Sequence, residues 1–262
     1  MGVVNATPDS FSDGGRFFDE AAAVSHALAL LDAGADILDI GGESTRPHAE
    51  PVSEAEELDR VAPVVAAIRR ARPGAVISVD TMKPAVMRAA ARAGAAIWND
   101  VTALTFAPDS LDVAAELGCG VVLMHMQGEP RTMQADPYYG DVVAEVGSYL
   151  AGRAEAAMRA GVAPERIWLD PGLGFGKTVA HNLALLRAIP ELKALGFPVL
   201  IGASRKSMIA RLDPGGARPD DRLGGSLALA LWSAAQGADV VRVHDVRETA
   251  QALRVWGAVE VL

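Results

Sequence analysis

Short apolar runs rich in β-branched residues recur along the chain, and stretches with helical spacing of apolar positions separate them. Strands that are buried on both faces have continuous apolar sequences, whereas half-exposed strands alternate apolar and polar positions. The runs are therefore typical of parallel strands covered by helices. We expect strands at Gly2–Val4, Ile37–Ile40, Val76–Val79, Ala96–Trp98, Gly120–Leu123, Ile167–Leu169, Pro198–Ile201 and Val240–Val243.

Helix ends between these runs carry recognisable signals. A glycine precedes most of the runs, as expected where a helix ends in the left-handed conformation; these are Gly34, Gly94, Gly118, Gly161, Gly196 and Gly237. The second helix instead ends at Arg72-Pro73-Gly74. Ser53 followed by Glu56 predicts a capping box, and Pro84 suits the first turn of the third helix.

The regular alternation of strands and helices indicates one architecture. Residues 1–262 show no change of composition between halves, and roughly 250 residues is typical of a (β/α)8 barrel. We predict a single α/β domain of this kind, a TIM barrel. The alternative is an open doubly wound sheet, which usually has a glycine-rich fingerprint after its first strand. The segment Asn5-Ala6-Thr7-Pro8-Asp9-Ser10 is not such a fingerprint.

Charge and composition exclude some function classes. The net charge of −9 argues against binding to nucleic acid or to an anionic membrane surface. The longest apolar stretch, Leu227–Ala235, is far shorter than the ~20 residues of a membrane span, and residues 1–8 do not resemble a signal peptide. The single cysteine, Cys119, excludes an internal disulfide and is expected to be a buried thiol in a cytoplasmic protein.

Polar residues end nearly every expected strand, at the end of the barrel where active sites lie. They are Asn5, Glu43–Arg46, Asp80, Asn99, Asp100, His125, Asp170, Ser204–Ser207, Arg242 and His244. Helix capping could account for one such residue, and suits Asp80 better than Asp170, which precedes a glycine-rich loop. So many converging ends favour an active site. Two carboxylates with the amide of Asn99 can recognise a flat heterocycle that has adjacent hydrogen-bond donors and acceptors.

An anion site and a metal ion are also expected at this end of the barrel. The basic set is Arg46, Arg205, Lys206, Arg242 and His244, and a helix that starts within Ser204–Ser207 would add backbone donors. Gly176-Lys177-Thr178 suggests a P-loop, but Pro171 occupies the position of its first glycine. The histidines lack zinc spacing. Mg²⁺ fits better, with Asn5 or Asp13 as a ligand. Two long loops, Ala6–Phe17 and Gly41–Val52, are predicted to be mobile lids.

Several segments match the signatures of one family in order. They are Asn-Ala-Thr-Pro-Asp-Ser-Phe-Ser-Asp-Gly-Gly (5–15), Asp-Ile-Gly-Gly-Glu-Ser-Thr-Arg-Pro (39–47), Ser-Val-Asp-Thr (78–81), Asn-Asp-Val (99–101), Met-His-Met-Gln-Gly (124–128), Asp-Pro-Gly-Leu-Gly-Phe-Gly-Lys (170–177), Ser-Arg-Lys-Ser (204–207) and Arg-Val-His-Asp-Val (242–246). Along nearly its whole length the chain resembles the dihydropteroate synthases. The resemblance implies that 6-hydroxymethyl-7,8-dihydropterin pyrophosphate condenses with p-aminobenzoate to give 7,8-dihydropteroate and pyrophosphate.

The resemblance also implies roles for individual residues. The pterin site comprises Asp80, Asn99, Val101, Met124, Asp170, Gly174, Lys206 and Arg242. Pyrophosphate is expected at Asn5, Arg46, Arg242 and His244, with Mg²⁺ at Asn5 and Asp13. The p-aminobenzoate site comprises Phe11, Thr45, Arg46, Pro47, Phe175, Lys206 and Ser207. The residues implied to be catalytic are Asp80, Asp170, Lys206, Arg242 and His244. The residues alone suggested pyrophosphate near Ser204–Ser207, where the family binds the p-aminobenzoate carboxylate.

The resemblance further implies inhibition by sulfonamides and a homodimer.

Two other functions are alternatives to this one. A methyltetrahydrofolate–corrinoid methyltransferase would share Asp80, Asn99 and Asp170, but it would not need Ser44–Pro47 or Ser204–Ser207, which are intact here. A non-catalytic pterin-binding paralogue should have lost residues of the lids or of the pyrophosphate site, and the sequence shows no such loss.

Overall fold

The computed structural model describes residues 1–7, 20–43, 51–128 and 132–260. The strands are β1 (Gly2–Asn5), β2 (Ile37–Gly41), β3 (Val76–Asp80), β4 (Ile97–Asp100), β5 (Gly120–Met124), β6 (Ile167–Asp170), β7 (Leu200–Ile201) and β8 (Val240–Val241). Strands β1 to β6 form one parallel sheet in chain order, and β7 pairs with β8. All of the predicted strands are present.

Two short bridges close these strands into a barrel. Leu169 of β6 pairs with Val199, and Gly2 of β1 pairs with Val243, both in parallel. The amide of Leu169 donates to the carbonyl of Pro198 at 2.9 Å. The predicted (β/α)8 barrel is therefore confirmed. The last two strands are shorter than expected, whereas β1, β3, β4 and β6 extend to include the polar residues that were expected just beyond them.

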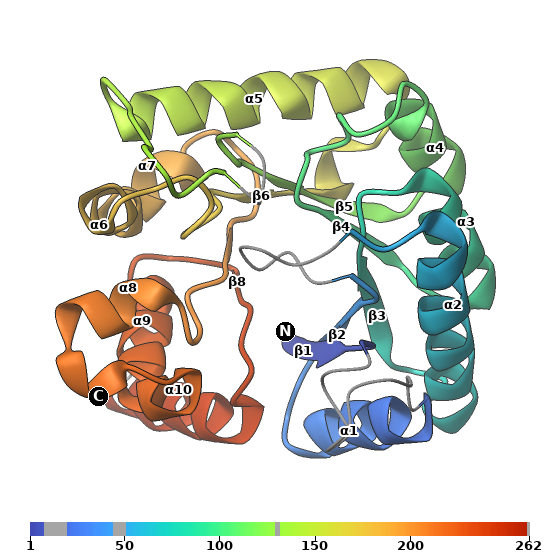
Figure 1. The fold of residues 1–262 in the computed structure, drawn as a ribbon, viewed down its shortest axis with the longest axis horizontal. Coiled ribbons are helices and arrows are strands. Elements are labelled where there is room, and N and C mark those ends of the chain that lie inside the picture. Colours follow the sequence, from blue (N-terminus) through green and yellow to red (C-terminus); the bar gives the residue numbers. More distant parts are fainter. Residues whose placement is uncertain (8–19, 44–50, 129–131, 261–262) are drawn as a thin grey trace.

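The helices lie around the outside of the barrel (Figure 1). They are α1 (Glu20–Asp32), α2 (Glu54–Ala71), α3 (Pro84–Ala93), α4 (Ser110–Leu117), α5 (Val142–Ala160), α6 (Val179–Arg187), α7 (Ile189–Lys193), α8 (Ser207–Leu212), α9 (Leu223–Ala235) and α10 (Val246–Glu260). Short 3-10 helices span Pro164–Arg166, Pro214–Gly216 and Pro219–Arg222. None of the described helices is long and apolar enough to cross a membrane.

Most of the predicted helix-end signals are found at the helix ends of the structure. Ser53 caps α2 because its Oγ accepts from the amide of Glu56 at 3.3 Å, although the Glu56 side chain pairs with Arg60 rather than completing a capping box. Pro84 occupies the first turn of α3. All six of the expected C-terminal glycines adopt positive φ angles. The buried thiol of Cys119 lies in the core, as predicted, and burial raises its pKa to about 11.

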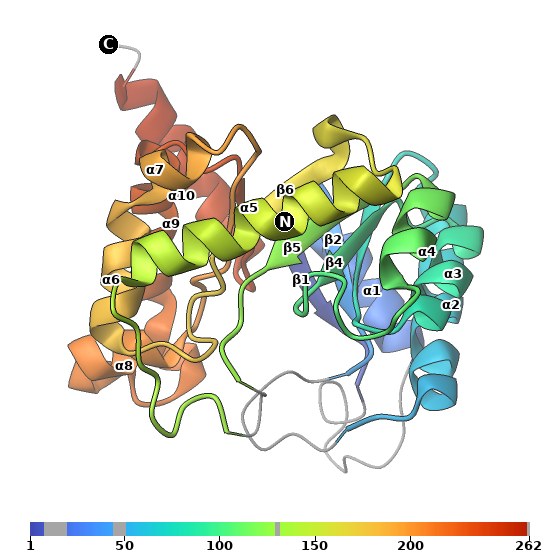
Figure 2. The ribbon, with the colours of Figure 1, turned by 90° about the horizontal axis from the view of Figure 1, so that it is seen from above.

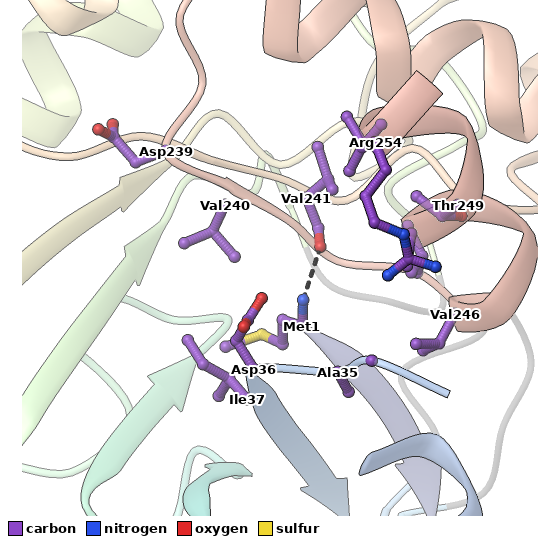
Figure 3. Close-up of a pocket in the computed structure, with 14 residues that line it drawn as sticks. Met1, Ala35, Asp36, Ile37, Asp239, Val240, Val241, Val246, Thr249 and Arg254 are labelled. Carbon is purple, nitrogen blue, oxygen red and sulfur yellow. Dashed lines mark hydrogen bonds between the residues drawn. The ribbon is translucent and has the colours of Figure 1, made fainter. Parts of the chain in front are cut away.

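A cavity of about 560 Å³ lies at the amino-terminal ends of the strands, beside Met1, Ile37 and Val240 (Figure 3). The terminal ammonium of Met1 donates to the carbonyl of Val241 at 2.9 Å within it. Burial lowers the pKa of that ammonium group. In barrels of this type the amino-terminal face contributes to stability, and chemistry occurs at the opposite face. The described part of the long β5–α5 connection lies at that opposite end (Figure 2).

Candidate active site

The strand register brings the predicted polar residues together at the carboxyl end of the barrel. Asp80 of β3 pairs with Gly41 of β2 on one side and with Asn99 of β4 on the other. Met124 ends β5 beside Asp170, which ends β6. Asn5 ends β1 next to Gly41. Val101 follows β4 and is buried.

Arg242, which follows β8, reaches across this end of the barrel. Its Nε donates to Oδ2 of Asp39 at 2.6 Å, and its Nη2 donates to Oδ2 of Asp80 at 2.8 Å. Asn99 donates from Nδ2 to the same Asp39 oxygen at 2.9 Å. Residues from four strands or strand ends thus form one hydrogen-bonded group. Asp39 is fully buried, and the sequence analysis assigned it no role.

Burial controls the charges of this group. It raises the pKa of Asp80 to about 7, against the opposing effect of Arg242. It also raises the pKa of Asp170, against the hydrogen bond from Gly172. Burial disfavours the charged form of Arg242, but Asp39 and Asp80 outweigh it and raise the arginine pKa. The site therefore holds buried carboxyl groups beside a permanent cation, and the oxygens of these groups can accept hydrogen bonds from the N–H groups of a heterocycle.

The capping alternative for the two aspartates is not supported. The residue that precedes α3 is Lys83, and it makes no side-chain cap. Asp80 instead pairs with Arg242. Oδ1 of Asp170 accepts from the amide of Gly172 at 2.7 Å, within the glycine-rich loop and before α6 begins. Both carboxylates are thus held at the barrel mouth.

The loop after β6 requires glycine because it packs closely on the connection after β5. Gly172 has a φ of +67°, and a Cβ there would lie 2.0 Å from the carbonyl oxygen of His125. Gly176 has a φ of +65°, and a Cβ there would lie 2.5 Å from the carbonyl oxygen of Gln127. Any larger residue would therefore push the two connections apart.

The buried side chain of Lys177 links this loop to the connection after β5. Its buried ammonium contacts Nδ1 of His125 at 2.9 Å and donates to the carbonyls of His125 and Phe175 at 3.2 and 3.0 Å. Burial lowers the pKa of Lys177 to about 7 and that of His125 to about 3. The sequence did not predict this contact, because His125 and Lys177 are 52 residues apart.

Lys206 also contacts this loop. Its Nζ lies 4.2 Å from the ring centroid of Phe175, a cation–π geometry. A Cβ on Gly174 would lie 3.3 Å from Cδ of Lys206. Burial lowers the pKa of Lys206 to about 8, with Asp170 opposing the shift. Phe175, Gly174, Lys206 and Asp170 therefore lie together, next to the exposed Ser207 at the start of α8.

The expected anion set needs one correction. Arg205 does not belong to it, because its guanidinium pairs with Asp245 and Asp220. The helix expected to start within Ser204–Ser207 does start there, at Ser207, and has six residues. Arg205, two residues before it, takes a left-handed conformation. His244 lies near Ser204, whose Oγ is 3.1 Å from Nδ1 of the histidine.

A second buried ion cluster was also missed. Nζ of Lys83 donates to Oε2 of Glu43 at 2.6 Å, to Oε2 of Glu57 at 2.5 Å and to the carbonyl of Val52 at 2.8 Å. The sequence did not predict this cluster, because both glutamates are distant from Lys83 along the chain, by 40 and 26 residues. The cluster connects the described ends of the segment Gly41–Val52.

Some predicted site residues fall outside the described residues, as do most residues of both predicted lids. They are Phe11, Asp13, Thr45, Arg46 and Pro47.

Comparison with known proteins agrees with this geometry. Residues 1–244 match the family of pterin binding enzymes. A polar site at the carboxyl end of a (β/α)8 barrel, together with this match, defines the class as pterin-binding enzymes.

Individual relatives narrow the class. The dihydropteroate synthase of Escherichia coli is 52% identical over 255 residues, which are 97% of this chain and 89% of the relative. The solved Xanthomonas albilineans dihydropteroate synthase with 4-aminobenzoic acid has a TM-score of 0.93 and 51% identity, covering 100% of this chain and 93% of the other. The Yersinia pestis enzyme with a sulfonamide drug has a TM-score of 0.94 and 47% identity, covering 100% and 94%. The chain belongs to the dihydropteroate synthase family, which sets the methyltransferase alternative aside.

Proposed function

We propose that the hydrogen-bonded group at the barrel mouth binds the pterin ring of the substrate. Asp80, Asn99 and Asp170 supply acceptors and a donor for the edge of the heterocycle, and Lys206 approaches from the side of Phe175. Arg242 lies across the mouth, where a guanidinium can stack on a flat ring. Val101, Met124 and Gly174 complete the pocket. The observation that carries this proposal is the hydrogen-bonded group of Arg242, Asp39, Asp80 and Asn99.

Pyrophosphate and Mg²⁺ are proposed to bind near Asn5, Arg242 and His244. Mg²⁺ commonly binds through one or two protein oxygens and completes its shell with phosphate and water. The amide oxygen of Asn5 fits that requirement, and no cluster of three or more acidic, histidine or cysteine ligands occurs among the described residues. When bound, the ion supplies charge neutralisation for the leaving group. Arg46 and Asp13 are assigned to the same site by family resemblance alone.

The p-aminobenzoate site is proposed to lie beside Phe175, Lys206 and Ser207. The solved structures of two relatives contain 4-aminobenzoic acid and a sulfonamide drug, which supports binding of such ligands by this chain. We therefore propose that this chain binds p-aminobenzoate and is inhibited by sulfonamides. Phe11, Thr45, Arg46 and Pro47 belong to this proposed site by resemblance.

The geometry supports a mechanism driven by departure of the leaving group. Arg242 and His244 stabilise the negative charge that develops on pyrophosphate. Asp80 and Asp170 hold the electron-rich pterin, which stabilises the methylene group as its bond to oxygen breaks. The aniline nitrogen then adds to the methylene carbon and releases its proton. Because the amine is already nucleophilic, no strong base is required.

Three broader features are also proposed. We propose a homodimer, consistent with exposed apolar side chains on the later helices, including Trp232 of α9 and Val255 of α10. We propose that residues 1–262 act as one domain. A cytoplasmic setting is proposed from the single unpaired cysteine.

One assay tests the proposed reaction directly. Pyrophosphate release is measured with dihydropterin pyrophosphate and p-aminobenzoate, together and separately. Release that requires both substrates and Mg²⁺ is expected. Release that is independent of p-aminobenzoate would contradict the proposed condensation.

A further inference from the structure

Arg205 and Asp245 form a fork-to-fork ion pair between two active-site connections. Nη2 of Arg205 lies 2.6 Å from Oδ1 of Asp245, and Nε lies 3.0 Å from Oδ2. Two parallel hydrogen bonds fix both the distance and the relative orientation of the two groups. Arg205 lies in the connection after β7 and Asp245 in the connection after β8.

A second contact runs beside this ion pair. Ser204 precedes Arg205, and its Oγ accepts from the amide of His244, which precedes Asp245, at 3.2 Å. The same oxygen lies 3.1 Å from Nδ1 of His244. Two consecutive residues of one connection are thus bonded to two consecutive residues of the other.

The backbone of Arg205 is fixed as firmly as its side chain. Its φ of +57° lies in the left-handed region, which is unfavourable for a residue with a Cβ. Its amide donates to Oγ of Ser226 at 2.9 Å, and its carbonyl accepts from Nη1 of Arg222 at 2.8 Å. A strained residue with every polar group bonded is held by its surroundings, as is common at functional sites.

The ion pair between Arg205 and Asp245, which we call the clamp, lies next to two proposed site residues in the sequence. Lys206 directly follows Arg205, and His244 directly precedes Asp245. We propose that Arg205 and Asp245 are positioning residues, which set Lys206 and His244 at a fixed separation so that the pterin, p-aminobenzoate and pyrophosphate parts of the site fit one transition state. This inference rests on the proposed roles of Lys206 and His244.

The test compares conservative changes in the clamp with a matched control. Arg205→Lys keeps the charge but loses the planar fork, and Asp245→Asn keeps the shape but loses the charge. Asp220 is the exposed outer partner of the same guanidinium at 2.8 Å, so Asp220→Asn serves as the control. For each variant, kcat and both KM values are measured by pyrophosphate release, and the melting temperature is recorded.

A fold defect and misplacement of the site have different kinetic signatures. Partial unfolding lowers kcat in proportion to the remaining active enzyme and leaves KM unchanged. Misplacement of Lys206 raises KM for both substrates in the enzyme that is folded. We expect Arg205→Lys and Asp245→Asn each to raise both KM values at least fivefold and to lower kcat at least tenfold, with Asp220→Asn unchanged. The double variant should lose no more than the worse single variant, because one pair is broken in each case.

Two results would overturn the proposal. Unchanged KM values in both clamp variants, whatever their melting temperatures, would make the pair a fold element only, as would unfolding of both variants below the assay temperature. Either result leaves the proposed reaction standing if the wild-type chain releases pyrophosphate only with both substrates. Failure of the wild-type chain in that assay would instead remove the proposed function.

Discussion

Asp39 and Arg242 form a buried ion pair across the barrel mouth, with 2.6 Å between Oδ2 and Nε. Asp39 has no exposed surface, and its other oxygen has no hydrogen-bond partner among the described residues. Removing one member of a buried pair leaves an uncompensated charge, which commonly costs about 3–5 kcal/mol. The pair therefore supports both the orientation of Arg242 and the stability of the fold.

Replacement of Asp39 tests this dual role. Asp39→Asn should lower the free energy of unfolding by about 3 kcal/mol, measured by urea denaturation, and should weaken pterin binding because Arg242 loses its anchor. The control is Asp32→Asn, which removes an exposed ion pair with Arg72 at 3.0 Å and should cost about 1 kcal/mol or less. Equal stability of the two variants would contradict the assignment.

The contact between Lys177 and His125 predicts a change in titration. Burial and then the charge of Lys177 lower the pKa of His125 to about 3. Lys177→Met should therefore raise that pKa, but only part of the way to its ordinary value because burial remains. NMR titration of the His125 ring gives the measurement, and Lys193→Met, at a surface pair with Asp239, is the control. A His125 pKa that does not move would show that Lys177 is neutral or distant in solution.

The lowered pKa of His125 also predicts how the free energy of unfolding changes at acid pH. Its folded-state pKa of about 3 lies below the unfolded-state value of about 6.5. His125 therefore contributes stability that is present above pH 6.5 and is lost as the pH falls towards 3. His125→Gln should flatten this part of the curve of unfolding free energy against pH. A slope identical to that of the wild-type chain would contradict the assignment.

Asn5 offers a test of the metal site. Asn5→Ala removes the amide oxygen that is proposed to bind Mg²⁺ and should lower turnover at least tenfold, which corresponds to about 1.4 kcal/mol of barrier. The melting temperature should stay close to that of the wild-type chain, since Asn5 ends β1 and its backbone pairing remains. Unchanged turnover at saturating Mg²⁺ would remove Asn5 from the metal site.

The barrel could be predicted from the sequence because its signals are local. Apolar runs mark the strands, and glycines mark the helix ends at positions such as Gly94 and Gly161, which adopt φ angles of 115° and 109°. The polar strand ends could be predicted for the same reason. Once the fold is a barrel, parallel strands bring those ends to one face.

Side-chain partners could not be predicted because they depend on contacts between distant segments. Asp39 was overlooked although a carboxylate inside an apolar run is unusual, since its partners lie 60 and 203 residues away. Arg205 was assigned to the anion site because sequence shows a cation at a strand end but not the direction of its side chain. Its partner Asp245 is 40 residues away.

Replacement of Asp170 is the most direct test that the barrel mouth binds pterin. Asp170→Asn keeps the size of the side chain, and its remaining oxygen can still accept from the amide of Gly172. The change replaces one acceptor by a donor at the proposed pterin edge, so pterin affinity measured by calorimetry should fall at least tenfold, about 1.4 kcal/mol or more. Thermal stability should change little, and the exposed Asp112→Asn control should bind normally. Normal pterin binding by Asp170→Asn, with a much lower melting temperature, would mean that the carboxylate is structural and would contradict the proposed pterin site.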